Sequence, residues 1–293
     1  MSHKAGFVNI IGNPNVGKST LMNVLVGEKL SIITPKAQTT RHRILGIVNG
    51  NGFQLVLSDT PGILKPHYKL QQSMLKFVNT ALKDADIILY MTDVIETSDK
   101  NHEYIEKIAK SKVPVLLLIN KSDLATTEKI ETLKQEWANI LPKAECFIIS
   151  ALQNINISSV LERIVSLLPE SPPYFPENQL TDKPERFFVS EIIREKILKN
   201  YEKEIPYSTE VEVEEFKEDE KIIRIRANIH VTRDSQKGII IGHKGAPLKK
   251  TGTEARQDIE DFFGKKAYLG LYVKVNKNWR NNEMLLKRFG YNN

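Results

Sequence analysis

Short apolar runs alternate with amphipathic segments along the first 170 residues. Apolar runs of four to eight residues indicate buried strands, and apolar residues that recur every three to four positions indicate helices. The expected strands are Gly6–Ile11, Ile44–Val48, Phe53–Ser58, Asp86–Thr92, Val113–Asn120 and Glu145–Ser150. The expected helices are Lys18–Val26, Lys69–Leu82, Lys100–Ala109, Lys129–Ile140 and Ile157–Leu168. This alternation predicts an α/β domain with a doubly wound, mostly parallel sheet, whose ligands gather at the carboxyl ends of the strands.

The pattern changes after Leu168–Glu185, a stretch with five prolines and no apolar periodicity. Such a composition is typical of a linker. We therefore expect a first domain at 1–170, a linker at 171–185 and a second domain at 186–293. The second domain should contain a helix, two alternating strands, a helix–glycine loop–helix and a last strand, at Arg186–Lys199, Thr209–Phe216, Lys221–Val231, Ser235–Phe263 and Ala267–Val275. This order predicts an α+β domain.

The composition, 41% hydrophobic and 27% charged, is that of a soluble globular protein, and no apolar run approaches the roughly 18 residues of a membrane span. The start of the sequence lacks a signal peptide, so we expect a cytoplasmic protein. The single cysteine, Cys146, excludes an intramolecular disulfide and should be a buried small hydrophobe. The histidines at positions 3, 42, 67, 102 and 230 show no metal-like spacing.

The net charge of +6 is unevenly distributed. Residues 221–293 hold 16 Lys and Arg against 6 Asp and Glu, so this stretch carries +10 and the rest of the chain −4. Only the C-terminal end is expected to attract a polyanion. Lysines that merely solvate a small domain would produce the same charge, so a motif must decide between these interpretations.

The first motif, GNPNVGKS at Gly12–Ser19, follows the first strand and opens a helix, matching GxxxxGK[ST]. Its backbone amides and the helix dipole should face an anion, Lys18 should reach the terminal phosphates, and Ser19 should hold Mg²⁺. This P-loop predicts binding of a nucleoside triphosphate. The residues expected around the phosphates are Gly12, Asn13, Pro14, Asn15, Val16, Gly17, Lys18, Ser19 and Thr20.

The base is expected to be guanine, because NKSD at Asn120–Asp123 ends an apolar strand about 100 residues after the P-loop. The Asp123 carboxylate can accept from guanine N1–H and the exocyclic amine, whereas adenine would leave it facing a lone pair. Asn120 should brace the loops, and the stem of Lys121 should cover the base. After a later strand, Ser150, Ala151 and Leu152 could present the Ala151 amide to guanine O6.

The third motif is DTPG at Asp59–Gly62. Asp59 could hold Mg²⁺ through water, and the Gly62 amide could sense the γ-phosphate, so that the following loop changes when this phosphate leaves. A Mg²⁺-contacting threonine is expected in KAQTTRHR; we favour Thr40, with Thr39 as the alternative, because spacing does not separate them. The expected metal set is Ser19, Thr40 and Asp59, and the residues expected to act in hydrolysis are Lys18, Thr40 and Gly62.

The second domain contains the tetrad GHKG, Gly242–Gly245, between two expected helices. In this position it matches the KH loop that clamps about four nucleotides of single-stranded RNA. His243 and Lys244 would add positive potential, and the three isoleucines before the tetrad could form a wall for stacked bases, although core packing explains at least half of them. The expected RNA-contacting residues are Ile239, Ile240, Ile241, Gly242, His243, Lys244, Gly245, Lys249 and Lys250.

Together these motifs resemble those of Ras-like translational GTPases, and QTTRHR with the C-terminal KH domain resembles the bacterial Era family over nearly the whole chain. The resemblance implies a P-loop GTPase domain followed by a KH domain of prokaryotic type. It further implies GTP and GDP, Mg²⁺, the 3′ end of small-subunit ribosomal RNA and the assembling 30S subunit as ligands and partners, with no DNA expected. It also implies weak peripheral membrane contact, which the basic tail Lys277–Asn293 could support.

The resemblance departs from Ras at Ile63, which follows DTPG where Ras-type enzymes have the water-orienting glutamine. Intrinsic turnover should therefore be slow. Relatives with an asparagine at the position of Asn15 can use K⁺ as an activator, although Asn15 as a loop-stabilising residue is equally plausible. The alternative function is a passive RNA-binding chaperone with GTP as a structural ligand; an ATP-driven motor is disfavoured by NKSD.

Overall fold

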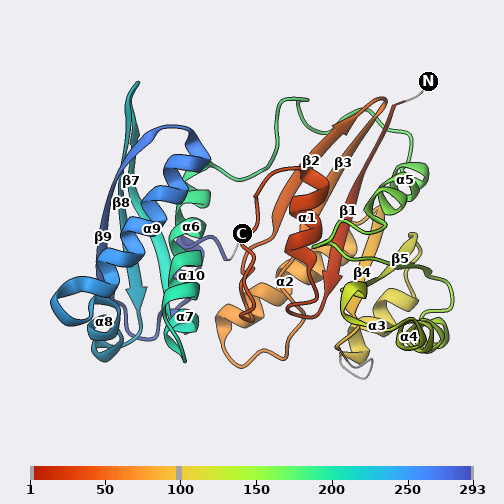
Figure 1. Ribbon diagram of the computed structural model, residues 1–293, viewed down its shortest axis with the longest axis horizontal. Coiled ribbons are helices and arrows are strands. Elements are labelled where there is room, and N and C mark those ends of the chain that lie inside the picture. The colour runs from red at the N-terminus through yellow and green to blue at the C-terminus, as the bar shows by residue number, and fades with distance from the viewer. Residues whose placement is uncertain (1–2, 97–100, 292–293) are drawn as a thin grey trace. The chain divides into compact units, whose positions relative to one another are not determined.

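The structure, a computed structural model, describes residues 3–96 and 101–291 (Figure 1). The chain divides into two compact units. The first comprises Met1–His67 and Gln71–Asp182, and the second comprises Lys183–Asn293 together with Tyr68–Leu70. Among the described residues, no helix combines the length and the apolar character that crossing a bilayer requires.

A six-stranded sheet forms the centre of the first unit, in the order β2-β3-β1-β4-β5-β6. Only β2 runs antiparallel to its neighbour, which confirms the predicted doubly wound, mostly parallel sheet. Its strands are β1 (Lys4–Gly12), β2 (Ile44–Gly50), β3 (Phe53–Asp59), β4 (Ile87–Asp93), β5 (Val115–Asn120) and β6 (Glu145–Ile148). The parallel strands β1, β3, β4 and β5 all end at the same edge, so the loops that follow them are neighbours.

Helices cover this sheet at positions close to the predicted ones. They are α1 (Lys18–Val26), α2 (Lys69–Lys83), α3 (His102–Ala109), α4 (Thr127–Ile140) and α5 (Ile157–Leu167). The predicted start of α3 at Lys100 lies outside the described residues. Apolar residues of α2, α3 and α4 share one core cluster with β4 and β5, while α1 contacts β1, β2 and β3. Cys146 is half-buried in β6 and packs against that cluster, so it is less enclosed than predicted.

Most of the predicted linker lies along the first unit. The Ile47 amide donates to the Leu180 carbonyl oxygen (2.9 Å), and the Leu45 amide donates to Asp182 (3.0 Å). The buried Gln54 side chain accepts from the Tyr174 amide and donates to the Phe175 carbonyl oxygen, each at 2.8 Å or less. Proline-rich segments lack periodicity, but their carbonyl groups can still satisfy the polar groups of a neighbouring strand. The predicted linker therefore belongs to the first unit as far as Asp182.

The second unit contains the three-stranded sheet β7-β8-β9, with β7 antiparallel and β9 parallel to β8. Its elements are α6 (Glu185–Asn200), α7 (Ile205–Ser208), β7 (Glu210–Glu218), β8 (Ile222–Val231), α8 (Asp234–Ile241), α9 (Ala246–Phe263), β9 (Lys266–Val275) and α10 (Glu283–Arg288). Figure 1 shows α6 and α9 side by side against the sheet. This arrangement confirms the predicted α+β domain; α7 and α10 were not predicted, because four and six residues are too few for a periodic signal.

The basic C-terminal segment is held to the second unit by buried groups. The indole of Trp279 is fully buried and donates to the Ser208 carbonyl oxygen (3.0 Å), and the Tyr291 hydroxyl donates to Glu210 (2.6 Å). Arg288 forms two hydrogen bonds to Glu212. The last two residues of the predicted tail lie outside the described residues. The segment through Tyr291 is thus part of the domain.

The core of the second unit corrects one prediction. Ile240 has no exposed surface and belongs to the cluster formed by α6, α9 and the sheet, and Ile241 packs against the same cluster. Ile239 is 50% exposed, and Ile241 is only partly buried. A helix turns by about 100° per residue, so three consecutive isoleucines cannot all face one side. The proposed wall of three isoleucines for RNA bases is wrong.

We expect Ile240→Ala to lower the stability of the second unit by about 2–5 kcal/mol, because it opens a cavity in a closed core. Ile239→Ala, the same truncation one residue earlier, should change stability by less than about 1 kcal/mol, since that side chain is largely in solvent. Urea unfolding followed by circular dichroism would measure both. Equal effects of the two substitutions would contradict this assignment of the core.

Candidate nucleotide site and RNA-binding surface

The P-loop connects the end of β1 to the start of α1. Gly17 has a φ of 104°, and a Cβ there would lie 2.2 Å from Asn120 Nδ2. Its left-handed backbone and the close approach of Asn120 both require glycine. The loop places the first turn of α1, with its free amides, at the carboxyl edge of the sheet. This is the geometry that binds phosphate groups.

Lys18 lies fully inside this loop. Its Nζ donates to the carbonyl oxygens of Gly12 (3.1 Å) and Asn13 (2.7 Å). Burial lowers the pKa of Lys18 to about 8, and the nearby Asp59 carboxylate partly offsets the shift. The hydrogen bonds of this buried ammonium go to neutral carbonyl oxygens, so a phosphate anion at the loop would stabilise its charged form. Its position agrees with the predicted contact to the terminal phosphates.

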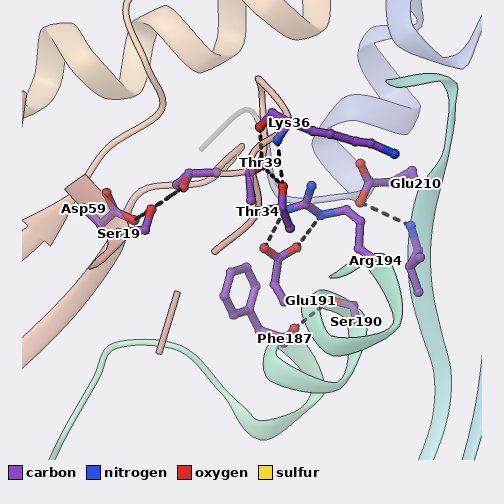
Figure 2. A network of polar contacts seen from close by, with 12 residues as sticks. Ser19, Thr34, Lys36, Thr39, Asp59, Phe187, Ser190, Glu191, Arg194 and Glu210 are labelled. Carbon is purple, nitrogen blue, oxygen red and sulfur yellow. Dashed lines mark hydrogen bonds and ion pairs between the residues drawn. The ribbon is translucent and has the colours of Figure 1, made fainter. Parts of the chain in front are cut away.

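Ser19, Thr40 and Asp59 meet beside the P-loop, although they come from three separate segments. Figure 2 shows Ser19 and Asp59 side by side. Ser19 Oγ donates to Asp59 Oδ2 (2.7 Å) and lies 2.9 Å from Thr40 Oγ1. Thr39 instead bonds to Thr34 and to the Lys36 carbonyl oxygen. Thr40 is therefore the threonine that reaches the metal-site residues, as we favoured.

These oxygen atoms fit a small divalent cation. They are hard ligands of the kind that Mg²⁺ prefers, and Asp59 Oδ1 is buried without a hydrogen-bond partner among the described residues. Burial raises the pKa of the Asp59 carboxyl, against the opposing effects of Lys18 and Ser19. A bound cation would stabilise the carboxylate form. Ser19 and Thr40 would contribute hydroxyl oxygens, and Asp59 would contribute the negative charge.

Asn120 joins the loops of the guanine site. Its Nδ2 donates to the Val16 carbonyl oxygen (2.7 Å), and its Oδ1 accepts from the Ala151 amide (2.9 Å). The Ala151 amide is therefore engaged by Asn120 in this structure, where we had expected it to face guanine O6. Asn120 links the P-loop to the loop after β6, which is the bracing role that the sequence predicts.

The remaining guanine-site residues line one pocket with the P-loop. Lys121 forms an ion pair with Asp93 (2.5 Å) at its edge, and Asp123, Ser150 and Leu152 line it as well. Sequence reasoning missed the apolar and switch-segment lining, namely Ile32, Ile33, Thr34, Pro35, Gln38, Ile95 and Leu124. Ile95 and Leu124 are largely exposed close to Asp93 and Asp123, and exposure of an apolar residue is not visible in the sequence.

The DTPG loop lies directly against the P-loop. The Ile63 amide donates to the Gly12 carbonyl oxygen (3.1 Å), and a Cβ on Gly62 would lie 2.6 Å from the Pro14 nitrogen. Only glycine permits this contact. The Ile63 side chain itself is buried in the core of the first unit. It points away from the pocket and has no group that could orient water.

The GHKG loop joins α8 to α9 in the second unit. His243 and Lys244 are exposed at its tip, and Lys244 has a left-handed backbone with a φ of 50°. Beside the loop, a groove runs between α9 and β9. Its lining is Gly245, Leu248, Lys249, Gly252, Thr253, Arg256, Leu269 and Leu271. Lys250 lies outside this lining and pairs with Glu254, so the two predicted lysines differ in position.

The groove contains residues that the sequence did not single out. Gly252 faces Leu271 across it, and the pair keeps α9 close to β9. Arg256 and Lys249 bring positive charge to the same side. Lys249 was among the predicted RNA-contacting residues, whereas the glycine and the leucines of the groove carried no sequence signal.

Two family models match the chain. The model described as 50S ribosome-binding GTPase matches residues 7–121, and the model of the KH domain matches residues 204–280. Among curated relatives, GTPase Era of Clostridium kluyveri is 45% identical over 290 residues, covering 98% of this chain and 99% of its own. The chain belongs to the Era family of GTPases. GTPase Era of Staphylococcus haemolyticus is 44% identical over 291 residues, covering 99% of this chain and 97% of its own.

Solved Era structures share this fold along their whole length. Era in complex with MgGDPNP and nucleotides 1506–1542 of 16S ribosomal RNA has a TM-score of 0.94 at 40% identity, and 99% of each chain is covered. A tyrosine-to-alanine variant of Aquifex aeolicus Era bound to GDP and AlF₄⁻ has the same TM-score and identity, covering 98% of this chain and 99% of its own. The sequence resemblance to Era is thus confirmed, and this Era-family chain is a GTP hydrolase.

In this Era-family chain, Arg43 holds the segment that carries Thr40. Its guanidinium donates to both Asp84 oxygens (2.5 and 3.0 Å) and to Ser58 Oγ (2.7 Å). Asn9, which also contacts Arg43, donates to the Ala81 carbonyl oxygen of α2 and to Asp84. One side chain three residues after Thr40 therefore connects this segment to the end of the helix that follows the DTPG loop.

We expect Asp123→Asn to shift base preference from guanine to xanthine nucleotides, because an amide can donate where the carboxylate accepted. The reversal should reach the order of 10⁴, as for other sites that lose a buried hydrogen-bond partner. Competition with a fluorescent nucleotide would measure it, with the exposed α9 residue Asp261 changed to Asn as the control. Unchanged base preference would contradict the guanine assignment and favour the alternative of an ATP-driven motor.

Arg43→Lys should lower the ratio of GTP to GDP affinity by about tenfold. Hydrogen bonds from a guanidinium to charged groups contribute about 1.5–3 kcal/mol each, and only part of this energy affects nucleotide binding. GDP affinity should change little, since GDP lacks the phosphate that the Thr40 segment approaches. Arg163→Lys is the matched control, because Arg163 pairs with Glu145 (2.7 Å) elsewhere in the first unit. Equal losses for GTP and GDP would show that Arg43 only stabilises the fold.

Proposed function

We propose that this Era-family GTPase acts as a Mg²⁺-dependent timer that holds the 3′ end of small-subunit ribosomal RNA during assembly of the 30S subunit. The proposed binding of Mg²⁺ and GTP rests on one observation, which is that Ser19, Thr40 and Asp59 lie together beside the P-loop. The exposed GHKG loop and its groove support the RNA part. The 16S ribosomal RNA bound by the solved Era indicates the class of RNA.

In the proposed GTP state, Lys18 contacts the terminal phosphates and Thr40 is drawn toward the metal-site oxygens. Bound Mg²⁺ would neutralise charge on the β- and γ-phosphate oxygens. Gly62, which packs on Pro14, would donate its amide to the γ-phosphate. Loss of this phosphate removes the ligand of both segments. The Thr40 segment and the DTPG loop would then relax together.

Water activation must use a group other than the buried Ile63. The Asn15 side chain donates through Nδ2 to the Pro35 carbonyl oxygen (3.0 Å), and this bond does not use its own carbonyl oxygen. We propose that this oxygen helps to hold K⁺ as an activator of hydrolysis. The contact to Pro35 also agrees with the loop-stabilising role, so K⁺ dependence of the rate separates the two.

We propose a cytoplasmic protein with a peripheral membrane-associated fraction. The exposed residues of α10, Met284, Lys287 and Arg288, offer an apolar and basic surface suited to anionic headgroups. No DNA partner is proposed.

The alternative of a passive RNA-binding chaperone with GTP as a structural ligand does not fit a chain that is a GTP hydrolase. What the timer adds is the coupling of hydrolysis to RNA, and rates of GTP hydrolysis with and without ribosomal RNA test it. A timer should hydrolyse GTP slowly alone and several-fold faster with RNA. Equal rates under both conditions would contradict the timer.

The variant His243→Asp with Lys244→Asp should abolish RNA binding at the GHKG loop, because it places two carboxylates where phosphates would lie. Aspartate tolerates the left-handed backbone at position 244, so the loop should keep its shape. Lys129→Asp with Lys134→Asp, on the exposed face of α4, makes the same change of charge as a control. We expect RNA to stop stimulating GTP hydrolysis only in the first variant, and equal behaviour of both would contradict the proposed RNA site.

A further inference from the structure

Ile223, Ile225 and Ala227 of β8 point to the core, so the residues between them point to the opposite, outer face of the second unit's sheet. The segment at α10 covers the His230 end of this face, because Phe289 packs on His230 and Arg288 bonds to Glu212. At the other end, Arg224 lies beside Tyr268 and Arg226 beside Gly270 in the register of β8 and β9. Tyr268 is 63% exposed and Tyr272 50% exposed. We call Arg224, Arg226, Tyr268, Gly270 and Tyr272 the outer stripe.

Gly270 separates the two tyrosines, and nothing in the fold requires glycine at this position. Its φ is not among the positive values, and an added Cβ would meet Tyr272 Cε2 at 3.6 Å, an ordinary contact. Glycine inside a strand weakens it, and often marks a place where a ligand approaches closely. Four residues of strand place Tyr268 and Tyr272 about 13 Å apart. Gly270 thus leaves a gap between the two tyrosines, and the Tyr272 ring extends into it.

Cationic side chains surround this gap. The Arg226 guanidinium lies 4.8 Å from the centre of the Tyr272 ring, and Lys217, Lys266 and Lys274 are exposed on neighbouring positions of the same face. Glu214 pairs with Arg226 and Lys274, Glu215 pairs with Lys217, and Asp219 lies 4.0 Å from Arg224. Lys266 also pairs with Glu260 (3.6 Å), so five basic groups face four carboxylates, which leaves a small positive surplus that suits a polyanion.

We propose that the outer stripe is a second surface for single-stranded RNA, where bases stack on Tyr268 and Tyr272 across the gap at Gly270 and the basic side chains contact phosphates. Exposed aromatic rings in a basic surface are the combination that binds unpaired strands. This inference rests on the proposed RNA function: a KH clamp holds about four nucleotides, so a longer RNA needs further contacts.

Two oligonucleotides from the 3′ end of small-subunit ribosomal RNA test the proposal, one of about four and one of about twelve nucleotides, because only the longer exceeds the clamp. Tyr268→Ala with Tyr272→Ala should weaken binding of the longer RNA at least about tenfold, given the contribution of base stacking. Binding of the shorter RNA should stay unchanged. Tyr268→Phe with Tyr272→Phe keeps the rings and should bind both RNAs like the parent protein.

Gly270→Val separates binding from folding. Valine favours strands and would fill the gap, so the melting temperature should hold or rise while affinity for the longer RNA falls. Unchanged affinity of the alanine variant for the longer RNA, or equal loss for both RNAs, would overturn the outer stripe as a binding surface. A parent protein that binds neither RNA would overturn the proposed function, and with it this inference. The His243→Asp, Lys244→Asp variant should instead lose the shorter RNA, which distinguishes the two surfaces.

Discussion

The nucleotide site depends on the buried side chain of Asn120. One carboxamide donates to Val16 of the P-loop and accepts from Ala151 of the loop after β6, while it packs on the bare Cα of Gly17. A buried amide costs free energy unless both of its ends are satisfied, so each of these loops must return to one position. The phosphate and base ends of the pocket are thereby held at a constant separation.

The second constraint on this site is electrostatic. Lys18 and Asp59 are buried side by side, and burial shifts the pKa of each toward its neutral form. Such a pair is poorly compensated by the protein alone. A phosphate and a divalent cation each supply the missing opposite charge, so ligand binding relieves a cost that folding imposes. Arg43 then connects the Thr40 segment of this site to the end of α2 through ordinary charge-assisted bonds.

The second unit uses the two faces of one small sheet differently. The inner face carries the isoleucine and valine core under α6 and α9, and the GHKG loop and its groove lie at the edge of that layer. The outer face has exposed tyrosines and arginines in register across β8 and β9. Because side chains alternate along a strand, one ten-residue strand serves a core and a solvent surface at once. Local composition averages these two faces, which conceals the outer one.

The amino-acid sequence by itself determined the order and type of nearly every long element, the P-loop, the guanine motif and the KH tetrad, because each depends on a local period or a fixed local spacing. The tertiary structure alone decided which isoleucine is buried, that Thr40 and not Thr39 meets Ser19 and Asp59, and that the proline-rich stretch lies on β2. It also decided that Ala151 binds Asn120 and that Tyr268 and Tyr272 flank a gap. These facts depend on side chains brought together from distant segments and on rotation about helix and strand axes, and no spacing along the chain encodes them uniquely.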